Sequence, residues 1–152
     1  MNNDFKRIIE QMPVLMERLM NTELQPWGKL GKLPESGIYA FYENGEPLYV
    51  GRSNRMRDRL KEHGRQGSPN NSAPFAFNIA KQDAERTGID IARTRTDLEH
   101  DNKFNKLFRL AKKRVSQMSI RVVEVDDPIL QTIFEVYAAM ELKTPFNDFD
   151  TH

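Results

Sequence analysis

The sequence contains no cysteine and only three histidines. Without thiols, the chain cannot form a disulfide framework, a thiolate zinc site or a cysteine nucleophile. With so few imidazoles, a transition-metal site built on several histidines is not expected either. A metal ion bound here would be a hard cation held by carboxylates.

Long apolar runs are also missing. No stretch reaches the roughly 18 consecutive apolar residues that indicate a membrane-spanning helix, so no membrane span is predicted. Lys6 and Arg7 interrupt the apolar residues near the N-terminus, which therefore lacks the uncharged core of a signal peptide. Together with the absence of cysteine, these features predict a cytoplasmic protein.

The chain has 152 residues, a length typical of one domain, and 38% of them are hydrophobic. Its net charge of +1 is close to neutral, but the positive charge is concentrated in two segments. Residues 52–66 carry a net charge of +4, and residues 103–121 carry +7. These two basic segments could bind a polyanion, or they could be solvated helix faces.

The hydrophobic pattern predicts an α+β fold in a single domain, residues 1–152. Helical spacing predicts helices over residues 4–20, 53–63, 75–86, 103–116 and from 128 to before Pro145. Strand-forming residues occupy 37–42, 48–51 and 118–125, and residues 21–36 are interpreted as a loop. Pro13 should kink or split the first helix, and Ser53 should cap the second, which Gly64 ends.

The predicted hairpin over residues 37–51 has two possible registers. A two-residue loop at Asn44-Gly45 would pair Tyr39 with Val50 and place Tyr39 and Tyr49 on opposite faces. A three-residue loop, with Gly45 in the left-handed conformation, would pair Tyr39 directly with Tyr49. We favour the second register, because it gathers an apolar set on one face: Ile38, Ala40, Leu48 and Val50.

A set of residues around this hairpin and near the other end of the chain has a characteristic order and spacing. In order, they are Gly37-Ile38-Tyr39, Tyr49-Val50-Gly51, Arg59, His63, Glu135 and Asn147. In type, order and spacing this set resembles the GIY-YIG nuclease family, over about residues 35–66 and 117–148. Val50 replaces the commoner isoleucine, and Arg52 stands where many relatives have lysine. The resemblance does not explain residues 67–116.

The resemblance implies both a fold and an activity. The fold is a small three-stranded antiparallel sheet flanked by helices, here with an N-terminal helical extension and loop, 1–36, and a helical insertion before the third strand, 67–116. The hairpin and catalytic helix would occupy residues 37–66. Residues 117–152 would contain the third strand, the metal-ligand helix and the C-terminal segment. The activity is metal-dependent hydrolysis of phosphodiester bonds in DNA by an endonuclease, with one Mg²⁺ or Mn²⁺ ion.

In this hypothesis the two motif tyrosines act on the attacking water. Tyr39 would be the general base toward water, and Tyr49 would hydrogen-bond in the same site or exchange roles with it. A tyrosine hydroxyl titrates near pH 10, so it needs a positive charge nearby, for which Arg52 is the first candidate. Replacing Tyr39 by phenylalanine should then abolish cleavage.

The remaining motif residues would act on phosphate and metal. Arg59 would bind the phosphate through two parallel hydrogen bonds, and His63 would be a second acid or base, or a phosphate donor. Glu135 would bind the metal ion, with Glu141 on the same helix as its competitor. Asn147 would contact phosphate or order the C-terminal segment.

The basic segment 103–121 does not belong to the motif, but Lys106, Arg109 and Lys113 could bind DNA phosphates without selecting a sequence. Two other functions stay open: a catalytically silent DNA-binding module, and an interaction protein whose residues 1–20 and 67–116 dock a partner. Specificity could come from a homodimer or a protein partner. The residues do not distinguish DNA from RNA.

Overall fold

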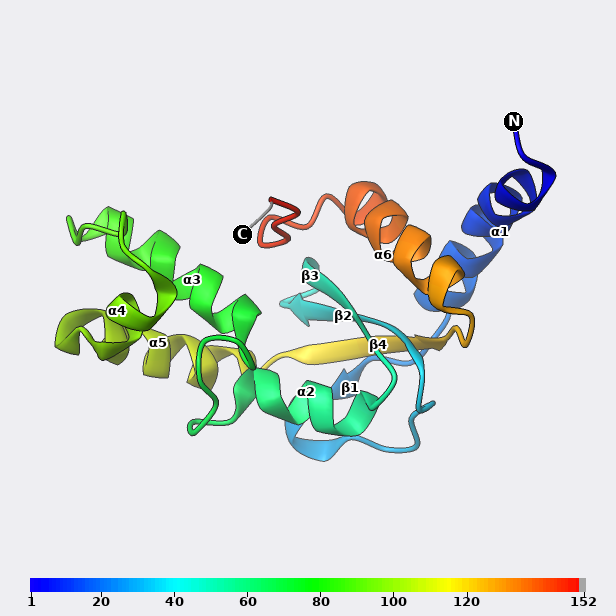
Figure 1. Ribbon diagram of the computed structural model, residues 1–152. Helices are drawn as coiled ribbons and strands as arrows, with labels where there is room; N and C mark the ends of the chain where they lie inside the picture. The colour runs from blue at the N-terminus through cyan, green and yellow to red at the C-terminus, as the bar shows by residue number, and fades with distance from the viewer. Residues whose placement is uncertain (151–152) are drawn as a thin grey trace.

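The computed structural model of the protein describes residues 1–150. The chain folds as an α+β structure, as predicted, with a sheet and helices packed on both of its faces (Figure 1). Its helices are α1 (Asn3–Met20), α2 (Met56–Gly64), α3 (Pro74–Arg86), α4 (Arg95–His100), α5 (Asn102–Val115) and α6 (Pro128–Leu142). Its strands are β1 (Gln25–Pro26), β2 (Gly37–Glu43), β3 (Glu46–Ser53) and β4 (Ser119–Glu124).

The sheet has four antiparallel strands in the order β1-β4-β2-β3, so the expectation of three strands is wrong. The additional strand, β1, lies within residues 21–36, which the sequence predicts to be a loop. A two-residue strand that contains proline gives no hydrophobic alternation and no strand propensity to detect. The order places β3 at the end of the sheet, with no further strand beside it.

Two apolar clusters hold the helices against the two faces of the sheet (Figure 1). One face carries α1 and α6, whose Leu19 and Phe134 pack with Ile38 of β2. The other face carries α2, α3 and α5, with Phe41 of β2 in that cluster. Because both faces are covered, six consecutive residues of β2 are buried, and the strand shows no alternation of polar and apolar residues.

The hairpin adopts neither predicted register. Its turn has two residues, Asn44 and Gly45, with φ values of 52° and 81°, which is the geometry of a type I′ turn. Phe41 pairs with Tyr49, and the register shifts immediately after Phe41, which leaves Leu48 as an extra residue. Because of this bulge, Leu48 lies on the same face of the sheet as Phe41. The sequence predicts it on the other face, with Ile38, Ala40 and Val50.

The bulge also decides how the two motif tyrosines lie. Tyr39 pairs with Gly51, and Tyr49 pairs with Phe41, two residues along β2. The two tyrosines therefore lie on the same face of the sheet as diagonal neighbours. They are neither directly opposite each other nor on opposite faces.

Three helices depart from the prediction in detail. α1 continues through Pro13 as one helix, on which Met12, Leu15 and Leu19 are buried, whereas Phe5 and Ile9 are exposed. α2 begins at Met56, because the Ser53 hydroxyl accepts a hydrogen bond from the Arg55 amide in a local turn and does not cap the helix. α4 was not predicted. None of the helices within residues 1–150 combines the length and apolar character needed to cross a membrane.

Candidate active site

Tyr39 and His63 form a buried pair. Tyr39 comes from the central strand β2 and His63 from the last turn of α2, and both side chains are almost completely inaccessible to solvent. The Tyr39 hydroxyl lies 2.6 Å from Nε2 of His63, within hydrogen-bond distance. The Phe41 ring contacts both rings edge to face. The Phe41 ring therefore packs against both members of the pair.

Gly51 provides the space that this arrangement needs. It lies opposite Tyr39 in the sheet, and a Cβ atom placed on Gly51 would be 2.3 Å from the hydroxyl and ring of Tyr39. The Tyr39 ring therefore lies across the position that a side chain at residue 51 would occupy. The glycine of the YVG triplet is required here because the tyrosine of the GIY triplet packs against its backbone.

We predict that Gly51→Ala lowers the free energy of unfolding by about 1–3 kcal/mol, the usual effect of overpacking. The new methyl group would displace the Tyr39 ring from its buried position. Urea denaturation of the two proteins measures the difference. Gly67→Ala is the matched control, because nothing lies within 4 Å of its Cβ position. Equal midpoints for Gly51→Ala and the unmodified protein would contradict this packing.

Burial keeps the Tyr39–His63 pair uncharged. It lowers the pKa of His63 well below its usual range, and the Arg59 guanidinium adds to that effect. Burial raises the pKa of the Tyr39 hydroxyl above its usual value, and the neighbouring Tyr49 adds to the increase, while Arg59 opposes it. At neutral pH the pair consists of a phenol and a neutral imidazole. Nδ1 of His63 has no hydrogen-bond partner among the described residues.

The low pKa of His63 predicts a loss of stability in mild acid. Below about pH 6.5 the unfolded chain protonates His63 and the folded protein does not, so the unfolded state binds more protons. This contribution to stability is complete above about pH 6.5, and is lost as the pH falls toward the folded pKa, by up to about 1.4 kcal/mol per pH unit. Urea denaturation at several pH values should show a flatter pH dependence in His63→Gln. Identical slopes in the two proteins would refute the prediction.

A cleft of about 240 Å³ lies beside β3, the strand at the end of the sheet. It is lined by one strand residue, by residues of three helices and by the C-terminal segment, which lies between α3 and α6 in Figure 1. The lining residues are Tyr49, Pro74, Asn78, Arg95, Glu135, Asn147, Asp148 and Phe149. Motif residues far apart in the sequence therefore meet at one place.

Tyr49 is the motif tyrosine that lines the cleft. Its ring stacks on Phe75 at 4.8 Å between centroids, and lies 5.5 Å from the His63 ring. Burial raises the pKa of Tyr49 to about 12, while the positive charges of Arg59 and Arg95 act to lower it. Tyr39 is packed behind Tyr49 and does not line the cleft.

Glu135 is the motif carboxylate that lines the cleft. Burial raises its pKa, and the Arg52 guanidinium, whose Nε lies 4.0 Å from Oε1 of Glu135, lowers it. Arg52 is thus placed beside the carboxylate. The cation that lowers the pKa of both tyrosines is Arg59, whereas the sequence favoured Arg52 for that effect. Glu141, the competing carboxylate on α6, is exposed and does not line the cleft.

These residues fit a magnesium ion better than a metal that needs several protein ligands. Within residues 1–150, no group of three or more His, Asp or Glu side chains could hold a metal. Mg²⁺ is usually held by one or two carboxylates, with water and substrate phosphate as the other ligands. Glu135 would be that carboxylate. Its partly buried position in a polar cleft, with a raised pKa, is where a cation would stabilise the charged form.

Arg59 and Asn147 are held by protein groups near the cleft. Nη1 of Arg59 donates to the Ser72 carbonyl at 3.1 Å and to Glu62 at 3.3 Å, and Arg59 does not line the cleft. Asn147 accepts a hydrogen bond from the Val50 amide and donates one to the Val50 carbonyl, both at 2.8 Å. Its side chain therefore attaches the C-terminal segment to β3, one of the two roles expected for it.

The other expected substrate-binding residues, Lys106, Arg109 and Lys113, do not reach the cleft. They line a separate groove beside α5. The sequence also gave no role to Arg95, which brings a positive charge from the insertion 67–116 to the cleft. A signal for α4 was present, because the Thr94 side chain caps the helix by accepting from the Asp97 amide, in a Thr-x-x-Asp pattern.

Comparison with protein-family models, with curated proteins and with solved structures gives no match for this chain. A functional conclusion therefore depends on the chemistry of the cleft and of the residues packed against it. Those residues include two carboxylates, Glu135 and Asp148, a tyrosine, an arginine from the insertion and a buried Tyr–His pair.

Proposed function

We propose that this protein is a GIY-YIG-type endonuclease that hydrolyses phosphodiester bonds in DNA with one Mg²⁺ or Mn²⁺ ion. The observation that carries the proposal is the meeting of Tyr49 and Glu135 in one cleft, with the Tyr39–His63 pair directly behind it. These residues come from β2, β3, α2 and α6, and a merely structural role does not require them to converge. The antiparallel β2, β3 and β4 also agree with the core sheet that the family resemblance implies.

Hydrolysis of a phosphodiester needs an activated water, compensation of phosphate charge and stabilisation of the leaving oxygen. A metal ion held by Glu135 would supply Lewis-acid stabilisation of the phosphate and the leaving oxygen. Tyr49 would orient the attacking water and, in its phenolate form, accept its proton, because it is the tyrosine that lines the cleft. The sequence analysis assigned the role of general base to Tyr39, and this proposal assigns it to Tyr49 instead.

Three arginines would balance the charge during this step. Arg59 and Arg95 both lower the pKa of Tyr49, so they favour the phenolate that must form before Tyr49 can accept a proton from water. Arg95 lines the cleft and would also bind a substrate phosphate. Arg52 would keep Glu135 ionised and ready to bind the cation. Tyr39 and His63, buried and neutral, would position Tyr49 from behind.

The proposal is tested by incubating the purified protein with supercoiled plasmid and with a branched oligonucleotide, in Mg²⁺, in Mn²⁺ or in EDTA. We expect nicking or cleavage with either metal and none in EDTA. DNA binding without cleavage under all three conditions would instead support a catalytically silent DNA-binding module. Cleavage of RNA alone would refute the assignment of DNA as substrate. A cytoplasmic location, in keeping with a chain that lacks cysteine, is part of the same proposal.

A further inference from the structure

We propose that the groove beside α5 binds a single-stranded segment of nucleic acid. This α5 groove is defined by Trp27, Arg65, Lys106, Arg109, Leu110 and Lys113. The assignment of DNA as the nucleic acid rests on the proposed nuclease function. The inference deepens that function by naming its substrate class. That class is DNA with a single-stranded part next to the duplex that is cut.

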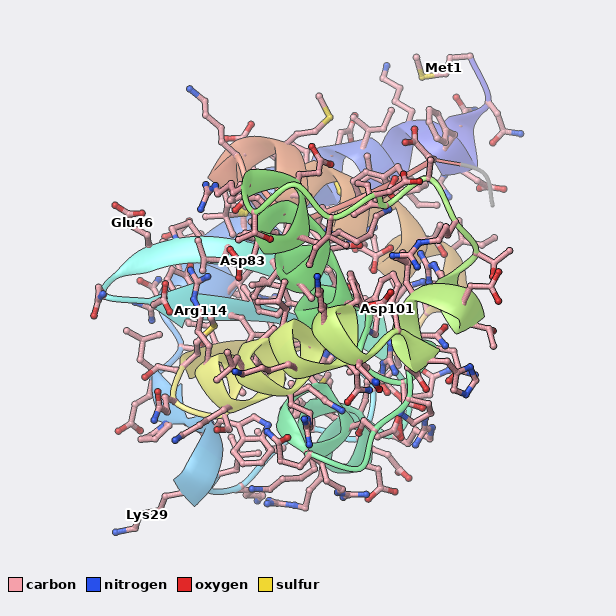
Figure 2. All side chains as sticks on the ribbon, turned by 90° about the vertical axis from the view of Figure 1, so that its left-hand side faces the viewer. Met1, Lys29, Glu46, Asp83, Asp101 and Arg114 are labelled. Carbon is pink, nitrogen blue, oxygen red and sulfur yellow. The ribbon has the colours of Figure 1, made fainter. Side chains whose placement is uncertain are left out.

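The α5 groove is separate from the catalytic cleft. It encloses about 650 Å³ between α5, the C-terminal end of α2 and the short 3₁₀ helix Trp27–Lys29. Figure 2 shows α5 running between the labelled Asp101 and Arg114, with Lys29 at the outer end of the segment that carries Trp27. That segment follows β1 at one end of the strand order, whereas the cleft lies beside β3 at the other. Substrate bound in the groove would therefore extend beyond the site of cleavage.

The rim of the groove is basic and lacks compensating charge. Lys106, Arg109 and Lys113 recur at helical spacing along one stripe of α5, and Arg65 faces them from the end of α2. All four are exposed, and none of them forms an ion pair within residues 1–150. By contrast, Arg114 on the same helix is paired with Glu43 at 2.7 Å. Four uncompensated cations on one rim are complementary to a chain of phosphates.

The floor of the groove is apolar, which phosphate binding alone does not need. Leu110 is 55% exposed there, a large apolar side chain left in water. The Trp27 ring is held in place, because Nε1 donates to the Leu60 carbonyl at 2.6 Å and Nζ of Lys61 lies 4.3 Å from the ring centroid. A Cβ atom on Gly64 would lie 2.8 Å from this ring. The floor is therefore a preformed apolar surface with an aromatic ring.

An apolar floor under a basic rim distinguishes between single and double strands. In a duplex the base faces are stacked inside the helix, so only phosphates and groove edges are presented to a protein. A single strand can place an unstacked base on an aromatic or aliphatic surface while its phosphates contact cations. The α5 groove offers both contacts together, so a single-stranded segment is the ligand that it fits.

The test uses the fluorescence of Trp27, the one tryptophan in the sequence. The full-length protein is titrated with a short oligothymidylate in EDTA, so that no cleavage takes place. We expect quenching, and affinity that falls with salt. Lys113→Ala should reduce the slope of log K against log salt by about 0.7, and Leu110→Ser should weaken binding several-fold with little change in that slope. Lys103→Ala, on the same helix but outside the groove, should leave both unchanged.

Several results would overturn this inference: no quenching, equal affinity for a duplex of the same length, or equal competition by polyglutamate. An effect of Lys103→Ala as large as that of Lys113→Ala would do the same, because it would indicate diffuse attraction. The result is independent of catalysis, since Glu135→Ala should bind the oligothymidylate normally. Quenching without any nuclease activity would leave the groove assigned and refute only the proposed enzyme.

Discussion

Replacing Tyr49 by phenylalanine is expected to lower kcat for DNA cleavage about 10²- to 10⁴-fold, the range found for loss of a general acid or base. Tyr49 lines the cleft together with Glu135, and in the proposed mechanism its hydroxyl acts on a water next to a bound phosphate. The substitution keeps the ring that stacks on Phe75 and removes one oxygen. The free energy of unfolding should therefore remain close to that of the unmodified protein.

Two other tyrosines provide the comparison. Tyr42→Phe removes a hydroxyl that donates to the sulfur of Met20, away from the cleft, and should leave cleavage unchanged. Tyr39→Phe removes the hydrogen-bond partner of the buried His63, which should cost about 1–3 kcal/mol of stability. Single-turnover cleavage and urea denaturation separate the two effects. If Tyr39→Phe slowed cleavage far more than Tyr49→Phe without loss of stability, the roles of the tyrosines would be the reverse of those proposed.

Replacing Glu135 by alanine is expected to abolish Mn²⁺ binding and to slow cleavage about 1,000-fold. A metal ion contributes several kcal/mol of transition-state stabilisation in such reactions, and each 1.36 kcal/mol corresponds to about a factor of ten in rate. Within the cleft, Glu135 is the motif carboxylate, and its partner Arg52 is exposed enough to remain solvated after the substitution. The protein should therefore stay folded, and metal affinity can be measured by calorimetry or by the electron paramagnetic resonance of Mn²⁺.

Glu141→Ala is the matched control for this experiment. Glu141 lies on the same helix, is exposed, and does not line the cleft, so its removal changes the net charge equally without touching the site. It should bind Mn²⁺ and cleave DNA as the unmodified protein does. Equal Mn²⁺ affinity in Glu135→Ala and Glu141→Ala would show that Glu135 is not the metal ligand.

Regular helices were predictable from the sequence, whereas the details of the sheet were not. α5 and α6 have clear apolar patterns, and the side chains of Asp101 and Asp127 cap them. The hairpin register depends on a bulge at Leu48, and no local residue signals it. β1 is too short to carry a pattern of its own.

The candidate site was predictable as a set of residues but not as an arrangement. Their order in the sequence indicated that Tyr49 and Glu135 belong to one site, and both line the cleft. Burial of Tyr39 behind Tyr49 depends on Gly51 and on the diagonal pairing of β2 and β3, which only the folded register reveals. Arg95 was missed because α4 has six residues, too few for a helical period to be detected.

The central claim is that the cleft at the edge of β3 is a metal-dependent nuclease site. The most direct test compares nicking of supercoiled plasmid by the unmodified protein, Glu135→Ala and Glu141→Ala, each in Mg²⁺ and in EDTA. The account predicts Mg²⁺-dependent nicking by the unmodified protein and by Glu141→Ala, and nicking about 1,000-fold slower by Glu135→Ala. Nicking by folded Glu135→Ala at the normal rate, or nicking by the unmodified protein that persists in EDTA, would contradict it.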